Sequence, residues 1–365
     1  MQRRLKLPEY VVEEENISRS TLKSTTVTPT GANRITPKGV SSSAFQRAWD
    51  AGYTGYGAVV AVIDTGVDGN HPDLKKAVVK HINLTNENLN EPHGTHVAGT
   101  IAADGLLTGG APGAKIIDIH VLGKYGGTIA SICQAIRIAA DEGAHIANMS
   151  LGASNIGLNQ INQLKQAVQY AWNKGTVCIA AAGNDGTSIC TPDPYSYPAS
   201  VDLAESVAAT DVGESLDQIT LAVFSNENNE VDIAACGKNV LSTVLGGKYS
   251  VFSGTSMATP HVSAMAAIFT QYIKKEFPEL RDRSFSEKLV GLLYDNVLEV
   301  RACAPQEIYV AGKLLMAITV NANVPSESYN ISFGRGFVRY RPRQGPVVPQ
   351  EEKLFYNNNF LGHFH

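Results

Sequence analysis

The chain has 365 residues, of which 44% are hydrophobic and 18% are charged, so it can bury a large core and is expected to be globular. Thirty Lys and Arg residues against thirty-four Asp and Glu residues give a net charge of -4, which argues against nucleic acid or an anionic membrane as the main partner. No run approaches the roughly 18 apolar residues of a membrane span. The length fits two domains, or one large α/β domain with terminal extensions.

The first 38 residues contain no long periodic segment and are rich in Ser, Thr, Pro and charge, which indicates an extension or linker. Pro8 and the acidic run 13–15 interrupt the apolar stretch that a secretory signal needs, so the chain is expected to be cytoplasmic. The five cysteines form an odd set without C-x-x-C spacing, which favours free thiols. The main alternative is a bridge between Cys178 and Cys190.

From residue 58 onward, short β-branched runs alternate with amphipathic helical runs. Apolar runs that suit strands buried on both faces cover residues 58–63, 115–121, 145–149, 176–181 and 206–209. Apolar residues recur at intervals of three and four over 132–139 and 161–172, as in helices that bury one face. This alternation predicts an α/β three-layer sandwich with a largely parallel central sheet flanked by helices. Functional sites in such folds lie at the carboxyl ends of the strands.

Two polar segments follow predicted strands or open predicted helices. The first strand is expected to end at Asp64, at the edge of the sheet, although an Asp there is more often an ordinary turn residue. The segment 93–100 opens a helix of small residues with His93 at its start. His96 lies three residues further on, whereas zinc-protease helices use a spacing of four with a neighbouring Glu. A metal pair is therefore not favoured, and His96 is interpreted as a core histidine.

Two further segments each carry a polar residue at the start of a predicted helix or after a predicted strand. Ser256 is expected at the start of an Ala-rich helix, where exposed N–H groups and the helix dipole favour an anion beside its hydroxyl; the alternative is a helix cap. Asn184 follows an apolar strand in a Gly-Asn turn, for which an ordinary left-handed turn is the alternative. Together with Asp64 and His93, these residues supply the nucleophile, base, orienting carboxylate and oxyanion donor of acyl transfer.

Four motifs stand in the same order as in the subtilisin-like serine proteases, which the chain resembles over about residues 39–270; they are Asp64-Thr65-Gly66, His93-Gly94-Thr95-His96, Ala182-Gly183-Asn184 and Gly254-Thr255-Ser256. Residues 224–232 and 246–249 are most similar to the intracellular subtilisins of bacteria. The resemblance implies a serine endopeptidase with a subtilisin-like fold, in which Asp64, His93 and Ser256 form the catalytic triad. It also implies an oxyanion hole formed by Asn184 and the N–H of Ser256.

The resemblance assigns further segments. Substrate is expected along Gly126, Gly127, Ser150, Leu151, Gly152, Ala182 and Gly183. Leu7, Pro8 and Tyr10 lie in a segment similar to the short inhibitory segment of the intracellular group, so residues 1–38 are expected to block the active site until removed. Residues 39–341 are expected to form the catalytic domain, with extra chain near 300–330. Residues 342–365 are expected to be a C-terminal tail.

The family's chemistry requires no cofactor, but a structural calcium or sodium ion is compatible with the resemblance, with Asp232 as the weak candidate ligand. The loop 104–111 is shorter than the one that wraps the tight calcium site of secreted subtilisins, so that site is expected to be absent. By the same resemblance, Ser196 is expected at the floor of the S1 pocket, where glycine is common, which leaves the S1 preference open.

The expected partners are protein or peptide substrates, not nucleic acid or a membrane, and a homodimer is compatible with the resemblance. Two other functions stay open. One is a processing protease of narrow specificity, and the other is a catalytically silent protein that uses the subtilisin fold for binding. The presence of Asp64, His93, Ser256 and Asn184 argues against the second.

Overall fold

The computed structural model describes residues 34–43, 45–186, 194–212, 219–228 and 230–295, and the backbone of short strands at 4–5, 308–310, 313–315 and 338–339. Leu7, Pro8 and Tyr10, most of the segment 300–330 and the tail 342–365 lie outside the described residues.

The described chain is organised around one mostly parallel sheet with the strand order β15-β10-β8-β7-β6-β2-β4-β3, and β9 pairs with β8. All neighbours from β10 to β3 are parallel, whereas β15 and β9 add antiparallel pairs at one end. The strands are β2 (Val59–Asp64), β3 (Val78–Asn83), β4 (Lys115–His120), β6 (Ile146–Met149), β7 (Val177–Ala181), β8 (Ala204–Val212), β9 (Ile219–Leu221), β10 (Ile233–Cys236) and β15 (Val338–Arg339). The largely parallel sheet is thus confirmed, and β8 extends beyond the predicted run on both sides.

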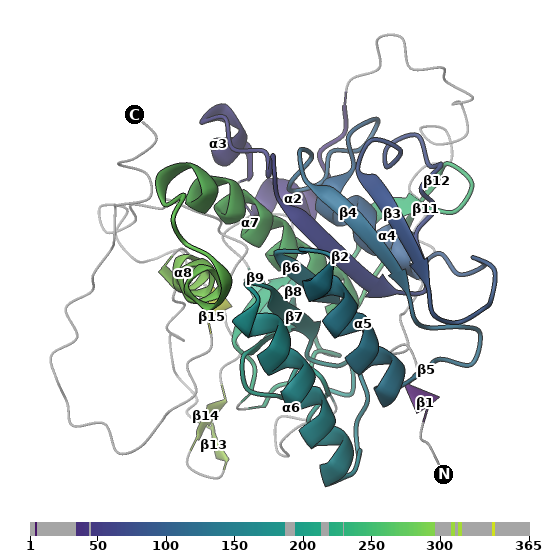
Figure 1. The fold of residues 1–365 in the computed structure, drawn as a ribbon, viewed down its shortest axis with the longest axis vertical. Coiled ribbons are helices and arrows are strands. Elements are labelled where there is room, and N and C mark those ends of the chain that lie inside the picture. The colour runs from purple at the N-terminus through teal and green to yellow at the C-terminus, as the bar shows by residue number, and fades with distance from the viewer. Residues whose placement is uncertain are drawn as a thin grey trace, which may run out of the picture.

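Helices cover both faces of this sheet. In the view of Figure 1, α5 (Ile129–Asp141) and α6 (Leu158–Asn173) lie in front, and α4 (His93–Ala102) and α7 (Thr255–Glu276) lie behind. Alternate residues of β2 enter different cores, because side chains of a strand point to opposite faces. Val60 and Val62 pack with α4 and α7, while Ala61 and Ile63 pack with α5 and α6. The predicted three-layer sandwich is therefore confirmed.

The remaining elements lie around the sandwich. The helices are α2 (Lys38–Ser42), α3 (Phe45–Asp50) and α8 (Asp282–Asp295). Three antiparallel strand pairs stand apart from the main sheet: β1 (Arg4–Leu5) with β5 (Gly127–Thr128), β11 (Val240–Val244) with β12 (Lys248–Phe252), and β13 (Ile308–Val310) with β14 (Lys313–Leu315).

The β11–β12 hairpin is bonded directly to the backbone of α4. The hydroxyls of Ser242 and Thr243 donate to the carbonyls of His96 and Thr95 at 2.7 and 2.8 Å. A Cβ at Gly99 would lie 2.1 Å from Thr243 Oγ1, so this approach requires glycine. Because the hairpin leads into α7 and α4 begins at His93, the contact fixes the two helix starts relative to each other.

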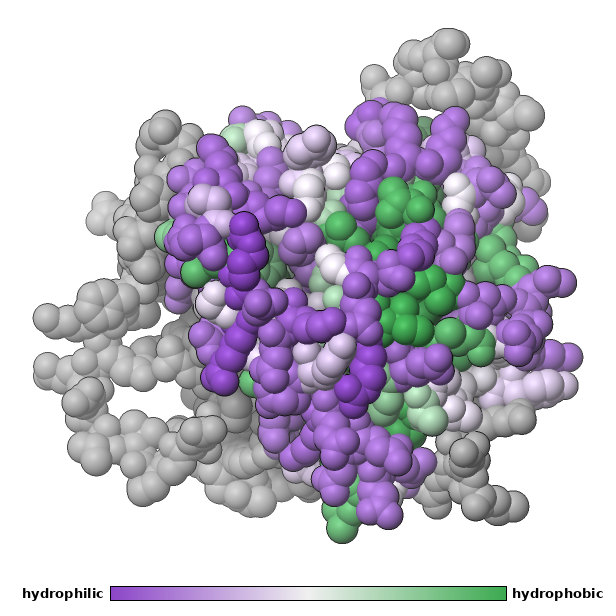
Figure 2. Space-filling view, viewed as in Figure 1, coloured by the Kyte–Doolittle hydropathy of each residue, from purple (hydrophilic) through white to green (hydrophobic). Residues whose placement is uncertain are grey.

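The outer face over α5 and α6 is mostly hydrophilic (Figure 2), and the described cysteines are free thiols. Figure 2 shows a largely hydrophilic outer face over α5 and α6, with apolar atoms gathered over β3 and β4. In the described part of the chain, no helix is long and apolar enough to cross a membrane. Cys133, Cys178 and Cys236 are free, as predicted, and burial raises the pKa of Cys178 and of Cys236 to about 12. Cys190 and Cys303 lie outside the described residues.

Candidate active site

Asp64 and His93 form a buried pair at the carboxyl edge of the sheet. Asp64 is the last residue of β2 and His93 is the first residue of α4. The Nδ1 of His93 lies 2.7 Å from the Oδ1 of Asp64, and both residues are fully buried. A carboxylate can only accept, so Nδ1 carries the hydrogen and Nε2 is the basic nitrogen of the ring.

Small residues allow the two elements to approach. The N–H of Gly94 donates to Thr65 Oγ1 at 3.0 Å, next to Asp64 in sequence. A Cβ at Gly94 would lie 2.4 Å from the carbonyl oxygen of Gly66. Any larger residue at position 94 would therefore push α4 away from the end of β2. The glycines of the two motifs thus serve the contact between Asp64 and His93.

Ser256 reaches the same edge of the sheet through Ser150. In the parallel pairing of β2 and β6, Val62 lies opposite Asn148. Asp64 and Ser150 each follow two residues later, so they lie at the same height at the carboxyl edge of the sheet. The hydroxyl of Ser256, near the start of α7, donates to the Ser150 carbonyl at 3.1 Å. The structure therefore brings the predicted nucleophile, base and carboxylate to one edge.

Asn184 is held at one end only. Its Oδ1 accepts from the N–H and the hydroxyl of Thr255 at 2.8 and 2.9 Å, and Thr255 immediately precedes Ser256. Its Nδ2 is buried, and no described residue accepts from it. An unsatisfied buried donor is costly, which is typical of a group that binds a ligand. Gly183, at φ 105°, provides the turn that places Asn184 here.

His96 is a structural residue, as the sequence analysis predicted. Its Nε2 lies 3.0 and 3.2 Å from the carbonyls of Val240 and Ser250, one on each strand of the β11–β12 hairpin. Burial, followed by the nearby charge of His93, lowers the pKa of His96 to about 3. His96 therefore remains neutral and holds the hairpin.

The expected substrate segments form two edges. One is the turn 123–126 leading into β5, where Glu87 Oε2 accepts from the N–H of Lys124 at 2.7 Å. Glu87 was not singled out from the sequence, and no motif marks it. The other edge follows β6 through Ser150, the buried Leu151 and Gly152 to residue 153. Ala182 is already bonded on both sides, by its N–H to Val207 and by its carbonyl to Asn226 Nδ2.

Ser196 lies between two of these segments. A Cβ at Gly152 would lie 2.2 Å from Ser196 Oγ, and a Cβ at Gly183 would lie 3.3 Å from Ser196 Cβ. Ser196 itself is 5% exposed. The side chain therefore occupies space between the 150–152 edge and the strand end that leads to Asn184.

Asp232 is the residue that the sequence analysis gives as the candidate cation ligand. Asp232 Oδ2 accepts from the N–H of Ser206 at 2.9 Å, and Asp232 lines a cavity of about 260 Å³ with Asp202, Glu205 and Glu230. Among the residues that the structure describes, no group of three or more His, Cys, Asp or Glu side chains could hold a metal ion.

The short loop 104–111 is bonded directly to a buried carboxylate. Asp73, 3% exposed, accepts from the N–H groups of Leu106 and Leu107 at 2.9 and 2.8 Å. It also accepts from the Tyr249 hydroxyl at 3.0 Å. Three protein donors thus bond this carboxylate, and two of them belong to the loop 104–111.

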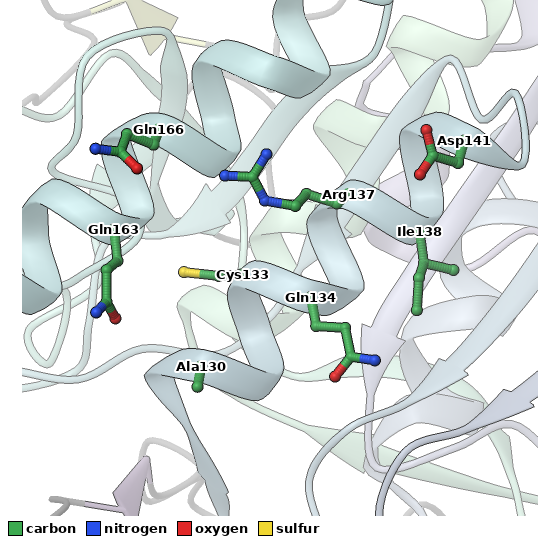
Figure 3. A pocket seen from close by; sticks show the side chains of 8 residues that line it. All are labelled: Ala130, Cys133, Gln134, Arg137, Ile138, Asp141, Gln163 and Gln166. Carbon is green, nitrogen blue, oxygen red and sulfur yellow. The ribbon is translucent and has the colours of Figure 1, made fainter.

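A cavity of about 540 Å³ forms a groove on the outer face between α5 and α6 (Figure 3). It is lined by Ala130, Cys133, Gln134, Arg137, Ile138, Asp141, Gln163 and Gln166. Burial raises the pKa of the Cys133 thiol to about 11, so this cysteine is not an activated nucleophile. The groove is therefore not a candidate active site.

A buried Asp-His pair, a serine at a helix start and an asparagine bonded to the residue before that serine, on a mostly parallel α/β sandwich, form the arrangement expected of a serine peptidase of the subtilisin type. The sequence model of the subtilase family matches residues 55–291, more than half of the chain. The chain therefore belongs to the subtilase family.

Curated relatives agree with this assignment. The chain is 39% identical to an intracellular serine protease of Paenibacillus polymyxa over 253 residues, 66% of this chain and 74% of that protein. It is 36% identical to the major intracellular serine protease of Bacillus subtilis (strain 168) over 270 residues, 70% of this chain and 81% of that protein. A thermophilic serine proteinase of Bacillus sp. (strain AK1) is 42% identical over 230 residues, 60% of this chain, but the match spans only 54% of that relative.

Proposed function

We propose that Asp64, His93 and Ser256 form the catalytic triad of a serine endopeptidase that cleaves proteins or peptides. The observation that carries this proposal is the 2.7 Å contact between the buried side chains of Asp64 and His93 at the sheet edge that Ser256 reaches. A carboxylate in this position orients the imidazole and stabilises the imidazolium formed when the base takes a proton.

Substrate binding can release the nucleophile. The Ser256 hydroxyl donates to the Ser150 carbonyl, on the edge where an extended substrate is expected to pair. A substrate N–H that donates to this carbonyl replaces the hydroxyl, which then turns toward Nε2 of His93. The resting hydrogen bond and the substrate's hydrogen bond therefore compete for the same oxygen.

The reaction then follows from the groups in place. Ser256 Oγ forms a bond to the scissile carbonyl carbon while its proton moves to His93 Nε2. The C–N bond breaks as the imidazolium gives that proton to the leaving amine, which leaves an acyl ester on Ser256. Water, deprotonated by His93, then attacks the ester and restores the hydroxyl.

Asn184 and the N–H of Ser256 would stabilise the oxyanion. The Nδ2 of Asn184 is buried, and its hydrogens have no acceptor among the described residues. An oxyanion that forms only during the reaction would accept from it, so this contact lowers the barrier without strengthening substrate binding.

The assignment is tested by substituting Ser256→Ala and Asn184→Ala. A fluorophosphonate probe should label the parent and not the Ser256→Ala protein, with thermal unfolding as the control for folding. In subtilisins, loss of the corresponding amide lowers kcat by about 10²- to 10³-fold, and the same fall with unchanged KM is expected for Asn184→Ala. Full labelling of the Ser256→Ala protein would place the nucleophile elsewhere.

We also propose that residues 1–38 inhibit the catalytic domain, 39–341, until they are removed. The support is strand β1, whose Arg4 and Leu5 pair antiparallel with Thr128 and Gly127 of β5. Gly127 belongs to the edge expected to bind substrate, and Figure 1 shows β1 beside β5. Leu7, Pro8 and Tyr10, which are expected to enter the side-chain pockets and resist cleavage, lie outside the described residues.

The proposed site of action is the cytoplasm, supported by two relatives named intracellular proteases. The net charge of -4 supports the inference that neither nucleic acid nor a membrane is the main partner. A narrow processing role remains the alternative, and a homodimer and a cation near Asp232 remain predictions. A catalytically silent binding role is disfavoured because the residues of the proposed triad and Asn184 are all present in the sequence.

A further inference from the structure

The first turn of helix α7, at the proposed nucleophile, lacks one of its backbone hydrogen bonds. In an α-helix, the carbonyl of each residue accepts from the N–H four residues later. Four residues after Ser256 stands Pro260, which has no N–H and whose ring crowds the carbonyl that it faces. The Ser256 carbonyl is therefore left without its helical donor, and both residues are buried.

Side chains bond three successive carbonyls of this first turn. Thr259 Oγ1 donates to the Thr255 carbonyl at 2.8 Å, and His261 Nδ1 lies 2.9 Å from the Met257 carbonyl. The Ser256 carbonyl between them accepts from Ser150 Oγ at 2.8 Å. Thr259 and His261 belong to α7 itself. Ser150 reaches across from the end of β6, so its bond fixes the helix start relative to the sheet.

Ser150 is in turn oriented by a buried polar chain. Ser263 Oγ donates to Asn148 Oδ1 at 2.7 Å, and Asn148 Nδ2 donates to Ser150 Oγ at 3.1 Å. All three side chains are fully buried. Because the amide nitrogen occupies one lone pair of the Ser150 oxygen, the hydroxyl hydrogen is free to point at the Ser256 carbonyl. A buried network of this kind is rigid when every member is satisfied.

We propose that the hydroxyl of Ser150, oriented by Asn148 and Ser263, is a positioning group that replaces the helical hydrogen bond removed by Pro260 and so holds Ser256 in reactive geometry. The inference rests on the proposed role of Ser256 as nucleophile. Ser150 acts through the Ser256 peptide group rather than on the substrate's reacting atoms. A displaced carbonyl would move the Cα of Ser256, and with it both the hydroxyl and the N–H of the oxyanion hole.

The test is a double-mutant cycle between Ser150→Ala and Pro260→Ala. Ser150→Ala keeps the backbone carbonyl of the substrate edge, so kcat should fall about tenfold with KM unchanged. Pro260→Ala restores an N–H four residues after Ser256. In that background, the same Ser150→Ala change should lower kcat less than about threefold. Ser263→Ala, which removes only the far end of the chain, should give a smaller fall than Ser150→Ala.

Thr270→Val is the matched control, because the Thr270 hydroxyl is also fully buried in α7 and bonds only to its own helix, at Ala266. It should change thermal stability without changing kcat. Equal losses from Ser150→Ala in both backgrounds, or a rise in KM in place of a fall in kcat, would overturn the positioning role.

The rate of fluorophosphonate labelling separates this proposal from the function on which it rests. Slow labelling of the Ser150→Ala protein at Ser256, with unchanged unfolding temperature, supports the positioning role. Parent-like labelling at Ser256 refutes the positioning role alone. Labelling that persists in the Ser256→Ala protein refutes the proposed nucleophile itself.

Discussion

His93 Nδ1 and Asp64 Oδ1 are in contact at 2.7 Å, and neither side chain is exposed to solvent. Water cannot replace either partner in this position, so the contact determines which ring nitrogen carries the hydrogen. The same Oδ1 also accepts from the N–H of Thr65 at 2.7 Å, which fixes the carboxylate itself. The orientation of the proposed base is therefore set by the end of β2.

Replacing Asp64 with Asn should lower kcat by about 10⁴-fold while leaving KM and the fold largely unchanged. An amide can turn its NH₂ group toward His93, which moves the ring hydrogen to Nε2, the nitrogen that must accept the Ser256 proton. Steady-state kinetics on a short peptide at neutral pH measure the effect. Parent-like activity of the Asp64→Asn protein would contradict the assigned triad.

Ser196→Gly should widen the pocket that accepts the substrate residue preceding the cleaved bond. Ser196 fills space between Gly152 and Gly183, so its removal should raise kcat/KM for a Phe or Tyr residue at that position by about tenfold relative to Ala. The comparison uses two peptides that differ only there. Equal changes for both peptides would show that Ser196 does not line this pocket.

The sequence predicted the central sheet and the elements that carry the motif residues, because both depend on local patterns. Apolar runs marked the central strands, and the family motifs placed Asp64, His93, Asn184 and Ser256 at the strand ends and helix starts where the structure has them. The contacts around them depend on tertiary packing and were missed. Asn148, a polar residue within the buried strand β6, was the one visible signal of its network. Nothing in the local sequence connects Asp73 to Tyr249, which are 176 residues apart.

A chelator should change thermal unfolding little, because the loop 104–111 is short and protein donors hold the Asp73 carboxylate beside it. Tyr249→Phe should instead lower the free energy of unfolding by about 1–3 kcal/mol, since it leaves a buried acceptor with one bond fewer. Tyr56→Phe, at a residue that is 75% exposed, is the control. Unfolding at room temperature on addition of EDTA would show that a tightly bound ion is part of the fold.

The stability against alkali should report on the same contact. Burial, followed by the charge of Asp73, raises the pKa of Tyr249 well above its usual range. A raised pKa contributes stability below the unfolded value of about 10, and this stability is lost as the pH rises through the folded value. The Tyr249→Phe protein should therefore lose less stability above pH 10 than the parent does.

Acid should weaken the fold through its buried histidines. Burial is the main cause that lowers the pKa of His96 to about 3, and of His145 and His261 to about 4. Their contribution to stability is complete above the unfolded pKa of about 6.5 and is lost as the pH falls toward these values. Urea unfolding of the Ser256→Ala protein, which avoids self-digestion, should show this decline.

His145→Gln isolates one histidine in that decline. His145 Nδ1 accepts from the N–H of Val59 at the start of β2, whereas the candidate active site lies at the carboxyl end of that strand. Its replacement should reduce the slope of stability against pH by up to about 1.4 kcal/mol per unit between pH 4 and 6.5. An unchanged slope would show that His145 binds a proton in the folded protein.

Deleting residues 1–20 should raise the initial rate on a short peptide and remove any lag, because β1 then no longer pairs with the substrate edge at Gly127. Leu5→Pro tests this pairing in the full chain, since proline supplies no N–H to a strand ladder and should release the segment. Thr25→Pro, outside β1, is the matched control and should retain the lag.

Pro8→Ala should make the segment itself cleavable. Mass spectrometry must show an intact leader when the rates are compared, because cleavage by a second molecule would otherwise hide the inhibition. If the truncated enzyme starts no faster than full-length protein with its leader intact, residues 1–38 do not block the cleft.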